Sequence, residues 1–356
     1  MNIVPARAMQ LAGSARERGE QQYQYWPGLK TAVRKAVELR LVSMQQKLES
    51  SFSSSFIAQQ WAFTQQHSPE SLQEIDGIAA GYGLSTADLF TYLHLGVIDD
   101  RIDAEDGCSI LACSNSDQGP ILAKNRDYQG EHQELQQVFH QSDPQWGQRR
   151  CLFVGSLGSP GAFSSGMNSD GLAIADNRIG WSQPGIGWLR YFLMTKILTS
   201  CGSVSEAIEL INQLEHVGGG AIVMADKHGE LASVELGHGK IHIERGCNNL
   251  LAHTNHYLEA DLARYATRNS VDPISDSSIN RLKVIMTDPL VGNPKPALSD
   301  VTKLFASHGS HHDALCRHGV DGDSTTISSV IFCCQSRQLY YCSTPPCKNN
   351  WQVYTL

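Results

Sequence analysis

The pattern of apolar residues changes at Gly107, and this change constrains the fold more than any other feature of the chain. Before it, residues 33–61 and 69–95 place apolar side chains three and four residues apart, the spacing of helices. Ser68 and Pro69 form a typical helix start. After Gly107, short apolar runs alternate with turn residues, which indicates strand hairpins. We therefore predict a helical N-terminal region, residues 1–107, and a strand-rich region, residues 108–356.

The strand-rich region also contains helix-forming stretches. We expect hairpins or strands at residues 109–112 with 120–123, 151–155, 162–167, 172–176, 221–225 with 231–235, 327–333 and 338–342. We expect helices at about 186–199, 203–214, 258–268 and 277–286. Strand hairpins interleaved with paired helices predict an α+β fold, with antiparallel sheets covered by helices.

Composition excludes several classes of protein. Hydrophobic residues make up 41% of the 356 residues, enough for a large core, and the net charge of −8 disfavours nucleic-acid binding, which needs a basic face. A membrane helix needs roughly 20 consecutive apolar residues, and no run approaches that length. The first nine residues do not resemble a secretory leader, and the ten cysteines show no CxxC spacing. These features predict reduced thiols in a cytoplasmic protein.

Cys108 is the strongest candidate for chemistry. It follows Asp106 and Gly107 and begins a strand, and Gly107 removes side-chain bulk and permits a strained backbone. A thiol that attacks the preceding carbonyl converts the peptide bond into a thioester, which water hydrolyses. The freed α-amine, with an ordinary pKa of about 8, can then act as the base for its own thiol. The alternative is a small buried apolar side chain, the usual role of a cysteine.

Lys124-Asn125-Arg126-Asp127 lies at the far end of the first predicted hairpin. A hairpin would bring Asp127 beside Cys108, where its carboxylate could accept a hydrogen bond from the freed amine. Lys124 or Arg126 would then supply positive charge that favours a thiolate. The alternative is a solvated, charged turn.

Two asparagines are candidates for stabilising an oxyanion. Asn168 lies in the turn of residues 166–172, and Asn255 follows the apolar strand of residues 250–252. Preorganised amide donors at a developing negative charge contribute several kcal/mol to catalysis. The alternative role of each asparagine is that of a turn former.

A histidine-rich loop is a weaker signal. Its candidate ligands are His308, His311, His312, Asp313, Cys316 and His318, residue types that bind metals. A polar loop is the favoured interpretation because the chemistry at Cys108 needs no metal. We therefore predict no metal and no cofactor.

Four motifs, in their order along the chain, resemble a known family. They are Asp-Gly-Cys at 106–108, Lys-Asn-Arg-Asp at 124–127, Gly-Met-Asn-x-x-Gly-Leu at 166–172 and Thr-Asn-His-Tyr at 254–257. They are similar to the acyl-coenzyme A:isopenicillin N acyltransferases and, more distantly, to bile salt hydrolases and penicillin V acylases. The resemblance covers the chain from about residue 68 onward. It implies a cysteine N-terminal nucleophile (Ntn) hydrolase, a four-layer αββα sandwich of two antiparallel sheets with a helical pro-segment.

The resemblance also implies residue roles. Cys108 matches the nucleophile, Asp127 the residue that holds its amine, and Asn168 and Asn255 the oxyanion-hole positions. Arg317 is the candidate for a late arginine that supports the thiolate. Lys124 stands where the bile salt hydrolase pattern has arginine, so Lys124 and Arg126 both remain candidates for charge support.

These observations predict a self-processing enzyme that cleaves the Gly107–Cys108 bond. Its Cys108 would pass an acyl group from a small amide or thioester, with acyl-coenzyme A one candidate, to water or to an amine. We expect the two self-cleaved chains to stay associated and to bind neither nucleic acid nor membrane; whether copies of the chain assemble is left open. One alternative is a hydrolase of N-acyl or β-alanyl amines that does not use acyl-coenzyme A. Another is a non-catalytic binding protein on the same fold, with the histidine loop holding a metal.

Overall fold

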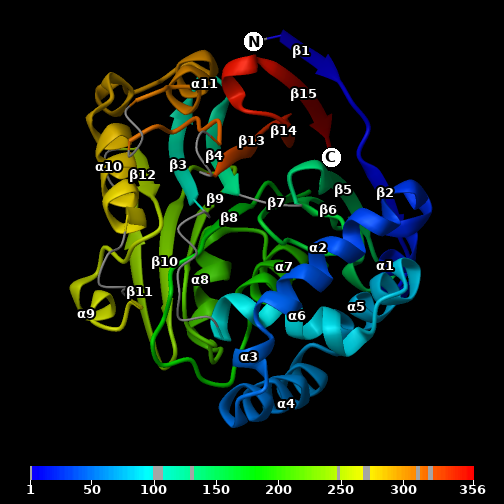
Figure 1. Cartoon of the computed structure of the whole chain (residues 1–356). Coiled ribbons are helices and arrows are strands. Elements are labelled where there is room, and N and C mark those ends of the chain that lie inside the picture. Colours follow the sequence, from blue (N-terminus) through cyan, green and yellow to red (C-terminus); the bar gives the residue numbers. More distant parts are fainter. Residues whose placement is uncertain are drawn as a thin grey trace.

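The computed structural model describes residues 2–98, 107–128, 132–246, 249–267, 273–309, 313–319 and 324–356. Two β-sheets form its centre (Figure 1). One sheet has eight strands, in the order β11 (Lys240–Arg245), β10 (Leu231–Gly237), β9 (Ala221–Ala225), β8 (Ala173–Asn177), β7 (Ser165–Asn168), β6 (Arg150–Ser156), β5 (Gln136–Ser142) and β2 (Met9–Ala12). The other has seven, in the order β1 (Asn2–Pro5), β15 (Asn350–Thr355), β14 (Gln338–Cys342), β13 (Thr325–Cys333), β4 (Gly119–Tyr128), β3 (Gly107–Ser116) and β12 (Leu250–His253).

Helices cover the outer face of each sheet, on opposite sides of the molecule in Figure 1. The eight-stranded sheet is covered by α1 (Ala15–Tyr25), α2 (Lys30–Ser43), α4 (Ser51–His67), α5 (Pro69–Tyr82), α6 (Thr86–Ile98), α7 (Arg190–Ser200) and α8 (Val204–Asn212). The seven-stranded sheet is covered by α10 (Pro273–Thr287) and α11 (Leu298–Phe305). A separate apolar cluster fills the space between the two sheets. The predicted α+β class and its four αββα layers are confirmed.

The central hairpin shows why the sequence builds three apolar layers. Along β3, Ile110 and Ala112 belong to the core between the sheets, whereas Leu111 and Cys113 belong to the core under α10 and α11. Successive side chains of a strand point to opposite faces, so a strand buried on both sides is apolar throughout. The continuous apolar run in β3 therefore reflects its position in a central layer.

The N-terminal region differs from the prediction in containing strands as well as helices. β1 pairs with β15 and β2 pairs with β5, and both pairs are parallel. The prediction of purely antiparallel sheets is therefore wrong at these two edges, and so is the prediction of a wholly helical region 1–107. Each of these strands has only four residues, the shortest run in which alternation can identify a strand.

Other differences are local. The helix predicted at 258–268 is reduced to α9 (Ala260–Ala263) in the part of that segment the structure describes, and β15 was not predicted. Ser68 precedes α5 as expected, but its hydroxyl bonds Glu70 and Ser71 instead of capping the helix. Within the described ranges, no helix combines the length and apolar character needed to cross a membrane.

Candidate active site

The β3–β4 hairpin places Cys108 and Asp127 at the same end of the seven-stranded sheet. Gly107 pairs with Asp127, and Cys108 pairs with Arg126. The predicted hairpin and the proximity of these two ends are therefore confirmed. Asp106, the first residue of the motif, lies outside the described residues.

Gly107 is required by space. A Cβ atom on Gly107 would lie 2.8 Å from Oδ2 of Asp127, closer than a side chain can approach without displacing the carboxylate. Gly107 is not among the residues with positive φ. The strained backbone that a glycine would permit at this position is therefore not observed. The glycine lets the Asp127 carboxylate pack directly against the main chain before Cys108.

Both main-chain groups of Cys108 are held by side chains. Its nitrogen donates to Oδ1 of Asn255 over 2.8 Å. Its carbonyl oxygen accepts from Nη1 of Arg281 over 2.6 Å and from Nδ2 of Asn177 over 3.2 Å. Cys108 is half-buried and lines a cavity of about 470 Å³, a size typical of small-molecule sites. Hydrogen bonds therefore fix the backbone of Cys108, and Cys108 forms part of the cavity wall.

A buried charge network lies beside Cys108. Nζ of Lys124 donates to Oδ1 of Asp176 over 2.8 Å, and Nε of Arg190 donates to Oδ2 of the same carboxylate over 2.7 Å. Burial alone would raise the pKa of Asp176, but Lys124 and Arg190 outweigh it and hold the pKa below its ordinary value. The network thus joins two cations to one anion next to the cavity.

Lys124 is the cation with the larger influence on Cys108. Burial raises the pKa of the Cys108 thiol; Lys124 opposes this most strongly and Arg126 least. Arg126 instead donates to Oε1 of Gln136 over 2.8 Å and packs over the ring of Phe163. Of the two residues proposed for charge support, the structure favours Lys124.

Asp127 keeps one oxygen without a hydrogen-bond partner among the described residues. Its Oδ1 accepts from Oγ1 of Thr326 over 2.6 Å, whereas its buried Oδ2 has Nε of Arg317 at 3.8 Å. Burial raises the pKa of Asp127, and Arg317 and then Arg281 oppose this rise. Oδ2 of Asp127 therefore keeps an acceptor position that no described residue fills with a hydrogen bond.

Two late arginines, Arg317 and Arg281, lie near Asp127 and Cys108. Arg317 donates from Nη1 to Oγ of Ser324 over 2.8 Å and from Nη2 to Oγ of Ser277, close to Asp127 but away from the cavity lining. Arg281, from α10, is the arginine that contacts Cys108. Burial lowers the pKa of Arg281 to about 10, and Asp127 opposes this. Arg281 was missed because a lone arginine in a helical stretch gives no sign that it is buried.

The two predicted asparagines have different surroundings. Asn255 lines the cavity, donates from Nδ2 to the carbonyl of Arg178 over 3.0 Å, and accepts from Cys108 through Oδ1. Its own nitrogen donates to Oγ of Ser278 in α10 over 2.7 Å, which fixes the loop after β12.

Asn168 is not brought to Cys108. Its amide nitrogen donates to the carbonyls of Leu198 and Cys201 at the end of α7, and its amide oxygen accepts from the nitrogens of Asp170 and Leu172. These four bonds close a turn and use the whole amide, and Asn168 does not line the cavity. Its predicted place in the oxyanion hole is therefore wrong.

Asn177, at the end of β8, is the second asparagine that the structure brings to Cys108. It follows the apolar run of residues 172–175 and Asp176. Polar residues at the end of an apolar strand were the only available signal for it, and that signal is common.

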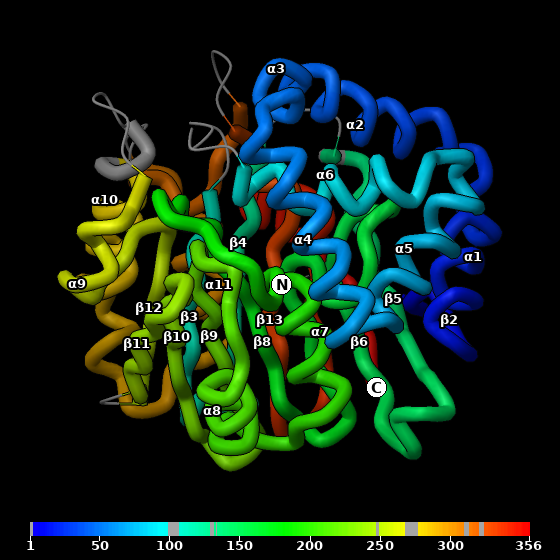
Figure 2. The backbone as a smooth tube through the Cα atoms, turned by 90° about the horizontal axis from the view of Figure 1, so that it is seen from below, coloured from blue at the N-terminus to red at the C-terminus, as the bar shows by residue number. Residues whose placement is uncertain are grey.

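The N-terminal region forms part of the cavity wall. Arg40 in α2, Lys47 in α3 (Gln45–Leu48) and Tyr92 in α6 line it, and α2 and α3 lie along one edge of the molecule in Figure 2. The hydroxyl of Tyr92 lies 2.8 Å from Nε2 of His132. Burial, followed by Arg126 and Arg40, lowers the pKa of His132 to about 3, so the ring is neutral at pH 7.

The histidine loop does form a cluster, with a membership that differs from the prediction. His308, Cys316 and His318 come together with Cys347, which the sequence pattern did not include. Asp313 does not belong to this group, and His311 and His312 lie outside the described residues. The cluster shares no residue with the cavity beside Cys108.

Comparison with known proteins covers three of the four motifs and begins after Asp-Gly-Cys at 106–108. The chain matches the family model described as acyl-coenzyme A:6-aminopenicillanic acid acyl-transferase over residues 114–347. The comparison with curated proteins gave no match. Among solved structures, a mutant conjugated bile acid hydrolase from Clostridium perfringens is similar with a TM-score of 0.45 and 14% identity, covering 70% of this chain and 92% of that one.

Penicillin V acylase from Agrobacterium tumefaciens is similar with a TM-score of 0.41 and 14% identity, covering 67% of this chain and 84% of that chain. These structural likenesses are weaker than the family match, which spans more than half of the sequence. The chain belongs to the acyl-coenzyme A:6-aminopenicillanic acid acyl-transferase family.

Proposed function

We propose that this chain is a self-processing cysteine enzyme that transfers or hydrolyses an acyl group through Cys108. One observation carries the proposal: Oδ2 of the buried Asp127 receives no hydrogen bond from the described residues and packs against Gly107, at the bond that self-cleavage would break. Cleavage there creates an α-amine on Cys108, which is the donor that this oxygen lacks. The site is thus arranged for a product of the chain's own chemistry.

In the first step, Sγ of Cys108 attacks the carbonyl carbon of Gly107. The C–N bond breaks, the nitrogen of Cys108 takes the thiol proton, and the Gly107 acyl group moves to sulfur as a thioester. Water then hydrolyses the thioester to a Gly107 carboxylate and a free Cys108 thiol. The bonds that Asn255, Asn177 and Arg281 make to the main chain of Cys108 would hold it in place during the attack.

In the second step, the same sulfur attacks a substrate carbonyl. The freed amine accepts the thiol proton, held by Asp127 and by Oδ1 of Asn255. Lys124 favours the thiolate against the effect of burial. Asn255, beside Cys108 on the cavity wall, is the proposed amide donor to the oxyanion. Removing one such donor typically costs about 10²–10³ in kcat.

Among the described residues, the cavity lining contains more basic than acidic side chains. The basic ones are Arg40, Lys47, Lys124, Arg126, Arg178 and Arg190, and the acidic ones are Asp127 and Asp176. A carboxylate or phosphate on an acyl amide or acyl thioester would complement this lining. Acyl-coenzyme A is one candidate donor, and an N-acyl or β-alanyl amine is another. Transfer and hydrolysis share the attack by Cys108 and differ only in whether an amine or water takes the acyl group.

The two chains produced by self-cleavage would remain associated. β1 and β2 extend the two sheets through backbone pairing with β15 and β5, and the N-terminal helices share one apolar core with α7 and α8. Residues of α2, α3 and α6 also form part of the cavity wall. Loss of the N-terminal chain would therefore remove one edge strand from each sheet and part of the binding site.

Denaturing mass spectrometry of the purified full-length protein tests the proposal. We expect two masses that correspond to a break before Cys108, and an uncut, folded and inactive Cys108→Ala variant. Cys113→Ala, a buried cysteine of the same strand, serves as the matched control and should be cut normally. A chain that stays uncut while turning over acyl amides or thioesters, with Cys108→Ala equally active, would refute the mechanism.

Product analysis separates the two reactions that share this intermediate. Each acyl donor is supplied with and without an amine acceptor. A new amide that appears only with the acceptor indicates transfer, and free acid in both mixtures indicates hydrolysis. An uncut chain that turns over no donor would instead favour a non-catalytic binding protein.

A further inference from the structure

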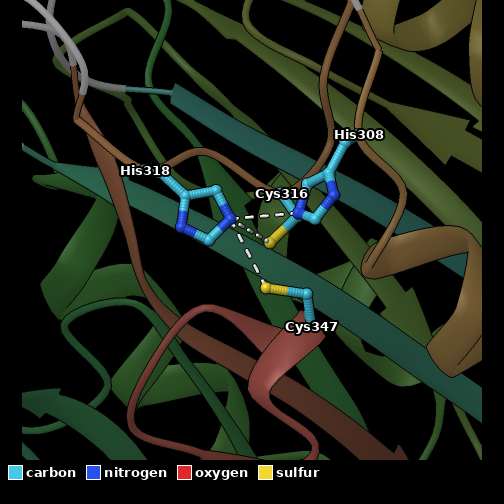
Figure 3. A group of neighbouring side chains, drawn as sticks. All are labelled: His308, Cys316, His318 and Cys347. Carbon is cyan, nitrogen blue, oxygen red and sulfur yellow. Dashed lines mark hydrogen bonds between the residues drawn. The ribbon is translucent and has the colours of Figure 1, made fainter.

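Four metal-binding side chains converge outside the active site. His308 follows α11, Cys316 and His318 lie in the segment between α11 and β13, and Cys347 lies in the 3₁₀ turn Pro346–Lys348. Figure 3 shows all four turned toward one point from these separate segments. One ligand atom from each residue, Sγ or a ring nitrogen, lies within 4.8 Å of every other.

The separations around His318 are close to those around a tetrahedral ion. Nε2 of His318 lies 3.0 Å from Nε2 of His308, 3.4 Å from Sγ of Cys347 and 3.7 Å from Sγ of Cys316. Zn–N bonds of about 2.0–2.1 Å and Zn–S bonds of about 2.3 Å place neighbouring ligand atoms roughly 3.3–3.8 Å apart. With every separation within 4.8 Å, small side-chain movements would bring all four atoms to coordination spacing.

We infer that His308, Cys316, His318 and Cys347 bind one Zn²⁺ in a closed, structural site. Two thiolates and two imidazoles are a ligand set that favours zinc over the oxygen-preferring Mg²⁺ and Ca²⁺. With four protein ligands no position remains for substrate, which is the character of a structural site. The two thiolates also balance the charge of the ion.

Zinc binds cysteine as the thiolate. Zinc binding at pH 7 is therefore expected to release up to two protons, one from each thiol.

A disulfide between Cys316 and Cys347 is the competing use of these two sulfurs. A disulfide would not explain why both histidine rings lie beside the sulfurs. The dithiol and the disulfide differ in mass, so mass spectrometry can detect the disulfide.

The site would stabilise the segment that carries Arg317. The nitrogen of Cys316 donates to the carbonyl of Ser307, and the nitrogen of Arg317 donates to Oγ1 of Thr326, which in turn donates to Asp127. Zinc bound to Cys316 and His318 fixes the residues on either side of Arg317. The ion would thus hold the outer support of Asp127 without contacting substrate.

Metal analysis of the purified full-length protein tests the site. We expect about one zinc per chain, and less than a tenth of that in Cys316→Ser, Cys347→Ser and His308→Asn. Cys201→Ser and His242→Asn are controls that replace the same residue types elsewhere, and both should retain zinc. Zinc that is absent from the wild type, or equally present in all variants, would overturn the inference.

A second measurement does not depend on the folding of variants. The wild-type protein is stripped with a chelator and titrated with Co²⁺, whose absorption reports tetrahedral thiolate ligation. We expect thiolate-to-cobalt bands that saturate at one equivalent, and a Tm that falls by about 4 °C or more on stripping and returns with zinc. Absent bands, or a Cys316–Cys347 disulfide peptide in protein purified without reductant, would refute the site.

Discussion

Cys108 and the pair Cys316 and Cys347 use sulfur in opposite surroundings. The charged groups beside Cys108 include Lys124, Arg126 and Arg281, whose nitrogens hold protons and cannot bind a metal. The nitrogens beside Cys316 and Cys347 belong to histidine rings, which have a free electron pair when neutral. In our proposals, the first setting supports a nucleophile and the second holds a metal ion.

The comparison teaches that the neighbours of a cysteine decide its role more than its own burial does. Burial raises the thiol pKa of both Cys108 and Cys316. At Cys108 the opposing cations belong to the protein and are present from the moment of folding. At Cys316 the opposing cation has to be bound from solution. Chelation should therefore disturb the second setting and leave Lys124, Arg126 and Arg281 in place beside Cys108.

The largest difference between the two settings is expected from Asp127→Asn and His308→Asn. An asparagine at 127 removes the negative charge proposed to hold the freed amine. We expect turnover to slow by about 10²-fold or more, because the amine that accepts the thiol proton is no longer held by a carboxylate. His308→Asn should change kcat/KM by less than about threefold. Steady-state kinetics of the self-cleaved proteins provide both values; equal effects of the two variants would remove the contrast.

Asp176→Asn tests whether the charges beside Cys108 are balanced by the protein itself. The variant leaves Lys124 and Arg190 buried without their shared carboxylate, and removing one partner of a buried pair costs about 3–5 kcal/mol. Urea unfolding measures the loss. Asp170→Asn, at a partly exposed pair with Arg149, is the matched control and should cost about 1 kcal/mol or less. A similar loss in both variants would contradict the assignment.

The same carboxylate gives a pH dependence of known sign. The folded pKa of Asp176 lies below its ordinary value, so the folded state binds its proton less readily than the unfolded state. Its contribution is therefore present above a pH of about 4, the unfolded value, and is lost as pH falls through the lower folded pKa. Stability measured between pH 6 and 3 should fall more steeply in the wild type than in Asp176→Asn.

The sequence predicted the Cys108 site wherever local structure determines it. Two apolar runs joined by a polar turn predict the β3–β4 hairpin, and the pairing of its two strands places Asp127 beside Gly107. The positions of Arg281 and Asn177 depend instead on how α10 and β8 pack against that hairpin, which local patterns do not encode. Asn168 was wrongly placed because an asparagine that closes a turn has the same local signature as one that contacts a substrate.

The second setting was predicted less completely for a similar reason. His308, Cys316 and His318 are close in sequence and were recognised as a group. Cys347 lies beyond β13 and β14 and reaches the cluster only because those two strands return the chain to the end of α11. A metal site assembled from distant segments shows its full ligand set only after the fold is known.

The smallest expected effect concerns the part of the Cys108 cavity supplied by the N-terminal region. Tyr92→Phe removes the hydroxyl that contacts neutral His132 at the wall, a hydrogen bond worth about 0.5–1.5 kcal/mol. Because this contact is remote from the reacting atoms, we expect KM to rise about 2- to 10-fold with kcat nearly unchanged. Tyr82→Phe, at a buried hydroxyl without a partner among the described residues, is the control and should leave both constants unchanged. A Tyr92→Phe enzyme that loses kcat while keeping KM would place the N-terminal region in the chemical step, and the contrast between a self-contained reactive centre and its supporting wall would have to be abandoned.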